Sequence, residues 1–401
     1  MSTFDLKDRT AISGVGDTEY GRPLNRSAID LAAEAFGNAC DDAGISTRDV
    51  DGLIMSVGSP LGVDCDSLAQ MLGLDLRMYS QTWTHGRFTA TCIQQAAMYV
   101  AAGFADTVAC MAALGSSGVQ AGLNPRPFNT DPFAAAAARD EAAREGGGGH
   151  GQDPVYGIDT TDVGAALVAR VYFDRYGATS EQLAAVSIAT RRHAAMNSGA
   201  MNREPLSLDD YMQSPLLATP LREPDYSLVA EGAACVIVTS TERARDMRKT
   251  PVLISGMQPL PVGREEFIWT YPGFGVAQQE RRAYGEKLQP VYKMAGVDHS
   301  AIDALFTYDV YSIITWMALE RWGFCKPGEA ADFTQGGRIE IDGELPINSH
   351  GGLLSEAHMF GWNAQVEIIR QMRGECGERQ LENTEMMQWA NAYGDSLIYR
   401  R

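Results

Sequence analysis

The segment 345–361, LPINSHGGLLSEAHMFG, holds the densest group of residues that can do chemistry. His358 titrates near neutral pH, which suits acid/base work. Asn348 and the backbone amides of the adjacent glycines Gly351 and Gly352 can bind a developing oxyanion, because glycine lets a backbone approach a ligand closely. A glycine turn before a helix, with His358 as a capping residue, is an equally good interpretation of this stretch by itself.

A second polar group, Tyr308-Asp309, stands at the end of an apolar strand pattern over 301–308. The ends of strands are common places for functional residues in α/β proteins. A core tyrosine whose hydroxyl is hydrogen-bonded is the plainer interpretation, and this segment alone favours it.

Three familiar motifs are excluded by spacing. Gly14-Val-Gly16 resembles the start of a dinucleotide loop, but Glu19 replaces the third glycine and would repel a pyrophosphate, so we interpret this stretch as a tight turn after a strand. His350, Glu356 and His358 fit no zinc-binding spacing, and no GxSxG occurs. The sequence therefore predicts no nucleotide site, metal site or serine-hydrolase elbow.

Strand and helix patterns alternate along the chain, which predicts an α/β fold with a parallel or mixed sheet. Each half repeats the order strand–helix–strand, although no internal sequence repeat accompanies it. Strands are expected at 10–16, 50–57, 107–114, 233–239, 251–256, 301–308, 386–393 and 395–399, and helices at 27–43, 87–102, 160–176, 180–198, 276–295, 312–322 and 360–373.

The chain divides into an N-terminal half, 1–245, and a C-terminal half, 250–401. Between residues 116 and 227 the composition changes, with an alanine-rich run at 134–143 and four consecutive glycines at 146–149. We expect this stretch to be an inserted loop and helical region. A length of 401 residues suits two or three domains, or one duplicated fold, at roughly 100–200 residues per domain.

Composition limits the protein class. Hydrophobic residues make up 45% and charged residues 21%, as in globular proteins, and 51 acidic against 33 basic residues give a net charge of −18. Such a charge disfavours nonspecific binding to nucleic acid or anionic membrane. There is no long apolar run or signal region, and the seven cysteines are scattered without a CxxC pair. We expect a reduced, soluble, cytoplasmic protein.

Taken together, these segments resemble the thiolase superfamily, specifically its sterol-carrier/lipid-transfer thiolase-like branch, along nearly the whole chain. The stretches that carry the resemblance include AISGVGDTEYGR, DDAGISTRDVDGLI, AAGFADTVA, EGAACVIVTSTERAR, YDVYSIITWMALERWGFCKPGEAADF, LPINSHGGLLSEAHMFG and QMRGECGERQ. The resemblance implies an α/β thiolase fold, in which two similar halves stack as α-β-α-β-α layers and carry an inserted loop domain.

One departure from the family is informative. Thiolases carry a nucleophilic cysteine at the start of the helix that ends in the G-x-A-D stretch, here 103–106, and the resemblance places Gly86, beside His85, at that position. Cys92 follows six residues later, about 240° around a helix, so we interpret it as a core residue. Without the thiol, acyl transfer through a covalent thioester loses its nucleophile.

A cysteine-lacking subgroup of the branch looks like a match: aldolases that cleave β-hydroxyacyl-CoA thioesters, notably in steroid side-chain degradation. They use one tyrosine that corresponds to Tyr308 and a second at the position of His358, which is histidine here. The resemblance thus implies a carbon–carbon lyase without a cofactor, since the substrate carries the CoA. Tyr308 and His358 become its catalytic pair, and the implied oxyanion- and substrate-binding residues are Asn348, Gly351, Gly352, Asp309, His85 and Gly86.

The resemblance also implies a homodimer, paired through an edge strand near 107–114, and a small OB-fold/zinc-ribbon partner that completes a heterotetramer. Two alternatives stay open: a thiolase or acyltransferase that uses another cysteine, and a noncatalytic acyl-CoA- or lipid-binding subunit. The missing cysteine disfavours the first, and the presence of both Tyr308 and His358 disfavours the second. The acyl group is left undefined; the aromatic residues that can line its pocket or fill the core are Trp83, Trp269, Tyr271 and Trp362.

Overall fold

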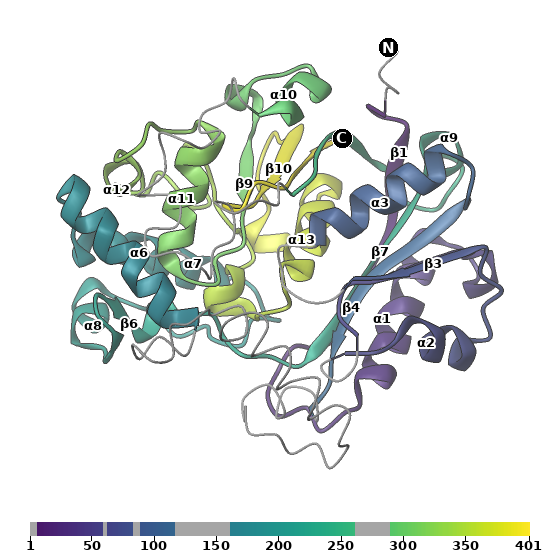
Figure 1. The fold of residues 1–401 in the computed structure, drawn as a ribbon, viewed down its shortest axis with the longest axis horizontal. Coiled ribbons are helices and arrows are strands. Elements are labelled where there is room, and N and C mark those ends of the chain that lie inside the picture. Colours follow the sequence, from purple (N-terminus) through teal and green to yellow (C-terminus); the bar gives the residue numbers. More distant parts are fainter. Residues whose placement is uncertain (1–5, 59–61, 83–88, 117–160, 261–288) are drawn as a thin grey trace, which may run out of the picture.

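The computed structural model describes residues 6–58, 62–82, 89–116, 161–260 and 289–401. In this part of the chain a nine-stranded mixed sheet has the order β3-β2-β4-β7-β1-β8-β11-β10-β9 (Figure 1). Its strands are β1 (Thr10–Asp17), β2 (Gly52–Met55), β3 (Met78–Gln81), β4 (Thr107–Leu114), β7 (Gly232–Ser240), β8 (Val252–Gln258), β9 (Ala304–Phe306), β10 (Met386–Ala390) and β11 (Ser396–Arg400).

Helices cover the sheet, and a short hairpin lies apart from it. The hairpin strands are β5 (Leu216–Ala218) and β6 (Leu221–Arg222). The helices are α1 (Ala28–Ala43), α2 (Cys65–Leu72), α3 (Thr89–Ala101), α6 (Thr161–Tyr176), α7 (Ser180–Ala195), α8 (Leu208–Gln213), α9 (Thr241–Arg245), α10 (Pro290–Ala295), α11 (Ser312–Trp322), α12 (Ala330–Phe333) and α13 (Trp362–Arg373).

The pairing of the strands repeats itself. In the first set β1, β7 and β4 pair antiparallel, and β4, β2 and β3 pair parallel. In the second set β8, β11 and β10 pair antiparallel and β10 pairs parallel with β9, beyond which Leu305 makes a parallel bridge with Ile347. The two sets meet where β1 pairs with β8. This repetition gives the two similar halves of the thiolase fold, while the domain boundaries 1–245 and 250–401, with the insertion at 116–227, stay predictions.

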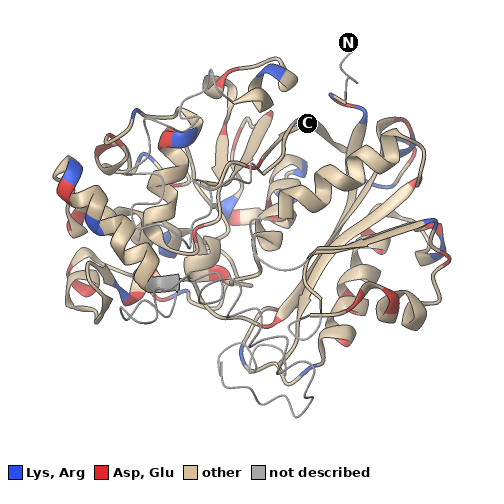
Figure 2. Ribbon diagram, in the orientation of Figure 1, with Lys and Arg blue, Asp and Glu red and all other residues tan. Residues whose placement is uncertain are grey.

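Both faces of β4 are buried, and the two-residue period of a strand divides its side chains between two helix layers. Ala109 and Met111 of β4 belong to the apolar cluster formed with α1 and α2. Val108 and Cys110 belong to the cluster that includes α3 and α13. Figure 1 shows α1, α2 and α3 toward one end of the molecule, α6, α7, α8 and α11 at the other, and α13 between them. Charged positions lie mostly on the outer helices and loops (Figure 2).

The glycine pair at 14 and 16 has a packing role. β1 continues to Asp17, so the predicted tight turn is wrong. A Cβ atom on Gly14 or Gly16 would overlap the backbone of α1 at Ala39. These glycines therefore let α1 lie close against β1, which is the reason for their spacing.

Several predicted elements need correction. The strand at 107–114 and the helix at 312–322 are confirmed with their bounds, but β4 is not an edge strand, because β2 and β7 occupy both its sides. The edge on that side is β3, which the sequence analysis missed together with α2. The strand expected at 301–308 ends at Phe306, and most of the helix expected at 276–295 lies outside the described residues, as do the glycines at 146–149.

Ion pairs tie α13 to the first strand set. Arg373 Nη1 lies 2.7 Å from Asp42 Oδ2, and Arg370 Nη2 lies 2.6 Å from Asp17 Oδ1. The Arg373 guanidinium is almost fully buried and also donates to the backbone oxygen of Ser13, so it is held from two directions. In the described ranges, no helix is long and apolar enough to cross a bilayer.

Candidate active site

The side chains of Tyr308 and His358 are in contact. Tyr308 lies two residues beyond β9 and just before α11, and His358 lies between a π-helical turn, Gly352–Glu356, and α13. The Tyr308 Oη atom is 2.9 Å from His358 Nε2, which is hydrogen-bond distance. Tyr308 is buried and His358 is half-buried. The structure therefore brings together the two residues that the sequence analysis paired, and it shows that His358 does not cap α13, whose N-cap is Gly361.

Ser227 completes a row of three side chains. Its Oγ atom lies 3.2 Å from His358 Nδ1, so both ring nitrogens of the histidine have a partner. The surrounding strap, 226–229, is pinned on both sides by its backbone: Ser227 N donates to the Val310 oxygen, and Leu228 N donates to the Leu353 oxygen. The sequence analysis missed Ser227, because 131 residues separate it from His358 and no local motif marks it.

Aromatic rings flank the pair. The Tyr393 ring lies 6.2 Å from the Tyr308 ring, and the Phe360 ring lies 5.1 Å from the His358 imidazole, edge to face. These apolar neighbours limit the rotation of both side chains. Trp362, which we considered for a substrate pocket, is fully buried and donates its Nε1–H to Ser56 Oγ at 2.7 Å, so it is a core residue.

The side chains of Asp309 and Asn348 are buried and hydrogen-bond to the backbone of the loop and of Thr307. Asp309 is fully buried and accepts from the Leu353 amide at 2.9 Å, and its burial raises the pKa of the carboxyl to about 6, opposed by that hydrogen bond. The Asn348 side chain accepts from Thr307 N at 2.9 Å and donates to the Thr307 oxygen at 3.1 Å. These two side chains are thus engaged with the loop and with β9.

Several backbone amides of the loop around Gly351 and Gly352 donate hydrogen bonds to oxygens of the same loop. The Gly351 amide donates to the Asn348 oxygen at 2.9 Å, and the amides of Ser355 and Glu356 donate back to the Gly351 oxygen. The oxyanion role that we assigned to this loop stays a prediction. His85 and Gly86 lie outside the described residues, as do Trp83, Trp269 and Tyr271.

No cysteine has the features of a nucleophile. All seven are free thiols, and burial raises the pKa of each one. For Cys92, which is fully buried and has Thr82 Oγ1 at 3.6 Å, burial raises the pKa to about 12. Because the thiolate is the reactive form, a raised pKa makes these thiols inert near neutral pH. The interpretation of Cys92 as a core residue is confirmed.

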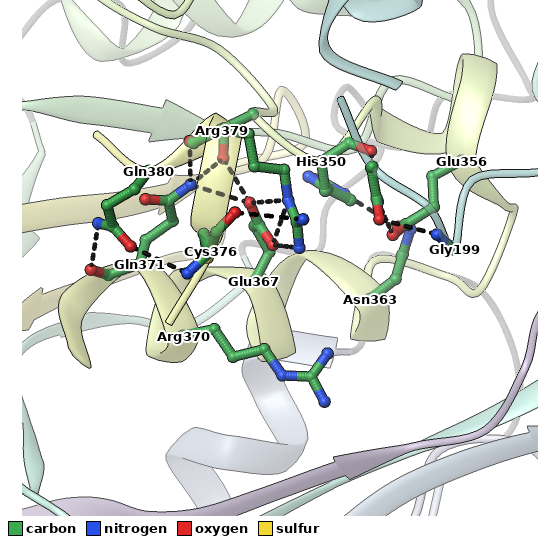
Figure 3. Close-up of polar contacts among 12 residues, drawn as sticks. Gly199, His350, Glu356, Asn363, Glu367, Arg370, Gln371, Cys376, Arg379 and Gln380 are labelled. Carbon is green, nitrogen blue, oxygen red and sulfur yellow. Dashed lines mark hydrogen bonds and ion pairs between the residues drawn. The ribbon is translucent and has the colours of Figure 1, made fainter. Parts of the chain in front are cut away.

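Polar side chains also fill the space behind the loop (Figure 3). Glu367 on α13 forms an ion pair with Arg379 at 2.9 Å, and His350 Nε2 lies 3.7 Å from Glu356 Oε2. Within the part of the chain that the structure describes, no group of three or more His, Cys, Asp or Glu side chains is arranged to hold a metal ion.

Comparison with known proteins identifies the family. Residues 281–396 match the thiolase C-terminal domain-like family. A protein of Thermomonospora curvata named "Steroid side-chain-cleaving aldolase" is 35% identical over 377 residues, which cover 92% of this chain and 91% of the relative. The chain belongs to the thiolase superfamily, in its aldolase branch.

Further relatives of this aldolase branch agree. The "17-hydroxy-3-oxo-4-pregnene-20-carboxyl-CoA lyase" of Mycobacterium tuberculosis is 34% identical, over 92% of each chain. The solved structure named "Ltp2-ChsH2(DUF35) aldolase" superposes with a TM-score of 0.82 at 32% identity and covers 99% of this chain and 98% of its own. Human mitochondrial 3-ketoacyl-CoA thiolase in complex with CoA, at 12% identity and a TM-score of 0.65, shares the fold.

Proposed function

We propose that this chain is a carbon–carbon lyase that cleaves a β-hydroxyacyl-CoA thioester by a retro-aldol reaction, releasing a ketone or aldehyde and a shortened acyl-CoA. The observation that carries the proposal is the contact between Tyr308 and His358 in a chain whose seven cysteines are free thiols with a raised pKa, six of them buried. Two relatives with 34–35% identity are named as an aldolase and an acyl-CoA lyase, which supports this reaction class.

The pair can move the proton that the reaction needs. Tyr308 removes the proton of the β-hydroxyl and passes its own to His358 Nε2, so the phenol need not ionise alone, which its ordinary pKa near 10 would oppose at neutral pH. The hydroxyl oxygen becomes a carbonyl as the Cα–Cβ bond breaks, and that electron pair moves into the thioester enolate. His358 then returns the proton to the enolate carbon. No thiol, metal or redox group enters this balance.

Ser227 supports the charged form of His358. When Nε2 receives the proton, the Nδ1–H can donate to Ser227 Oγ, 3.2 Å away. A hydrogen bond to the charged form stabilises it and fixes the ring in place. The backbone bond from His358 N to the Leu228 oxygen at 2.9 Å holds the same residue from its main chain.

The substrate class follows from the relatives. Their names refer to a steroid side chain and to a pregnene carboxyl-CoA. We propose a bulky acyl group of this kind for the present chain, carried on CoA. The thiolase alternative is disfavoured because no thiol is activated, and a noncatalytic lipid-binding role leaves the Tyr308–His358 contact without a purpose.

The purified protein, with its partner where one is required, is expected to split a steroid β-hydroxyacyl-CoA into a 17-ketosteroid and a short acyl-CoA. Both products can be followed by liquid chromatography and mass spectrometry. A β-ketoacyl-CoA supplied with free CoA should yield no shortened acyl-CoA, because thiolysis needs an activated cysteine. Robust thiolysis that Cys92→Ala abolishes would overturn the proposal, and Cys110→Ala, a change to another buried thiol, is its matched control.

We also propose a homodimer that pairs through the exposed edge strand β3 and binds a small OB-fold partner. Among the described residues β3 is the outermost strand on its side, and an edge strand offers hydrogen bonds to another chain; Tyr79 on β3 and Phe104 after α3 are exposed large hydrophobic residues. The solved aldolase neighbour is named with a DUF35 component, which supports a partner of that kind.

Tyr79→Lys is expected to convert the dimer to the monomer mass in sedimentation or light scattering, since a charge on the shared edge opposes pairing. Leu216→Lys, at another exposed apolar residue that lies on the separate hairpin, should leave the dimer intact. Co-expression with a DUF35 protein should give a larger assembly. A wild-type chain that is monomeric and fully active alone would contradict both parts.

A further inference from the structure

Glu356 ends the π-helical turn, two residues before His358, and its side chain points behind the loop (Figure 3). It is buried, and each carboxyl oxygen has its own amide partner. Oε1 accepts from Asn197 Nδ2 at 2.7 Å, and Oε2 accepts from Asn363 Nδ2 at 2.6 Å. Asn197 lies just beyond the end of α7 and Asn363 lies in the first turn of α13, so Glu356 joins two helices to one turn.

The same two amides hold the main chain on both sides of that turn. Asn197 Nδ2 also donates to the His350 oxygen at 2.9 Å, before the glycines. Asn363 Nδ2 also donates to the Ala357 oxygen at 3.1 Å, in the residue directly before His358. Glu356 therefore orients the donors that fix the two ends of the loop, and through Ala357 it fixes where His358 begins.

The cations near Glu356 are already paired with other acids. Arg379 pairs with Glu367, and Arg370 pairs with Asp17. Among the residues that the structure describes, neither a lysine nor an arginine forms an ion pair with Glu356. His350, whose Nε2 atom lies 3.7 Å from Glu356 Oε2, is neutral near pH 7, because burial lowers its pKa to about 4.

These surroundings keep Glu356 protonated. Burial raises its pKa to about 8, and the charges of Glu367 and Asp17 add to that effect, while the bonds from Asn363 and Asn197 oppose it. Tyr20 faces the same space and is itself held neutral by burial. At neutral pH the Glu356 side chain is thus a neutral carboxylic acid. It holds the loop without placing a negative charge near the His358 imidazole.

We propose that Glu356 is a positioning residue: by bonding Asn197 and Asn363 it holds the loop so that His358 Nε2 meets Tyr308. The inference rests on the proposed function, since it gives the loop a role in that reaction. In this proposal Glu356 takes no part in the proton transfer and serves only to position His358, which does.

Glu356→Leu removes both bonds and keeps the volume, and it is expected to lower kcat about 10–100-fold while KM for the CoA thioester stays near the wild-type value. Glu356→Gln is neutral at every pH and keeps one acceptor oxygen, which can accept from Asn197 or from Asn363 but not from both, so it should restore part of the kcat that Glu356→Leu loses. If Glu356→Leu fails to fold, Asn363→Leu removes one of the same bonds from α13 and must slow kcat in the same way. Wild-type turnover by the leucine variants, or a glutamine variant as slow as Glu356→Leu, would overturn the proposal.

Thermal unfolding supplies a readout that does not depend on the reaction. A carboxyl with a pKa of about 8 in the folded protein, against an ordinary value of about 4.3, keeps a proton that the unfolded chain releases. The neutral Glu356 carboxyl contributes fully to the free energy of unfolding below about pH 4.3. This contribution is lost as the pH rises from about 4.3 to about 8, and it changes no further at higher pH. The Tm of Glu356→Gln minus that of wild type should therefore increase from pH 5 to pH 8, and a constant difference would overturn the neutral-acid role.

Glu367→Gln is the matched control, because it makes the same change on the acid that Arg379 neutralises. It should lower Tm at pH 7 without the rising difference. Two variants distinguish a failure of the proposed active site from a failure of the positioning role. If Tyr308→Phe keeps wild-type turnover, the proposed site is wrong; if Tyr308→Phe loses turnover and Glu356→Leu does not, only the positioning role is wrong.

Discussion

Tyr308→Phe is expected to lower kcat about 10²–10⁴-fold, the usual contribution of a general acid or base. The change keeps the buried ring and removes only the hydroxyl that lies 2.9 Å from His358 Nε2, so the fold should survive. The loss should fall on kcat more than on KM, because the hydroxyl acts on a proton in transit and not on CoA binding. Steady-state cleavage of a β-hydroxyacyl-CoA, with circular dichroism as a check on folding, measures it.

Tyr311→Phe is the control for that experiment. Tyr311 lies three residues further on, is equally buried and loses the same hydroxyl, but its ring packs against Tyr226. It should keep wild-type turnover. His358→Ala should lose about as much as Tyr308→Phe, whereas His358→Tyr should retain part of the activity, since it introduces the tyrosine that the family resemblance implies at this position. Wild-type rates for both Tyr308→Phe and His358→Ala would place the site elsewhere.

Gly352→Ala is expected to damage both stability and turnover. Gly352 has φ +60°, and a Cβ there would overlap the Asp309 carboxylate and lie 3.0 Å from Asn348 Nδ2. The backbone strain alone costs roughly 1–3 kcal/mol. Displacing Asp309 would also strand the buried Leu353 amide, at roughly 1–3 kcal/mol more. A lower Tm, together with a kcat loss comparable to that of Glu356→Leu, is the expected result.

Gly374→Ala separates strain from collision. Gly374 ends α13 with φ +75°, and no atom lies within 4 Å of the Cβ that would be added. This variant should show the backbone cost alone, roughly 1–2 kcal/mol, and keep its turnover. Equal losses of stability in the two variants would show that the contact between Gly352 and Asp309 is not what constrains the loop.

The parts of the fold that the sequence predicted well are those with a strong local pattern. β4 is a continuous apolar run closed by Gly115, and α11 ends at a glycine with positive φ, so their bounds were readable. β3, by contrast, has four residues that alternate between half-buried and exposed, so no apolar run marks it. Missing β3 also led to the wrong edge strand, because an edge is a property of the whole sheet and not of one segment.

The site was predictable as far as its residues lie in motifs. Tyr308 and His358 stand in segments whose composition is unusual by itself, and their contact followed from the family fold. Ser227 and Asn197 stand in ordinary sequence and become relevant only through contacts made 131 and 159 residues away. Glu356 was noticed for its spacing from His350, but its burial, which decides its charge, is a result of tertiary packing.

The repeated strand pairing bears on how such an enzyme arises. Ser56 follows β2 in the first half as Thr307 follows β9 in the second, and both strands pair parallel with a neighbour that is itself in an antiparallel pair. A duplicated ancestor would begin with two equivalent loops. In this chain the proposed acid and base, Tyr308 and His358, both lie in the second copy, whereas Gly86, which the family resemblance places at the thiolase cysteine position, lies in the first. One lineage can thus exchange acyl transfer for bond cleavage through changes in one copy, while the other copy keeps the catalytic pair in place.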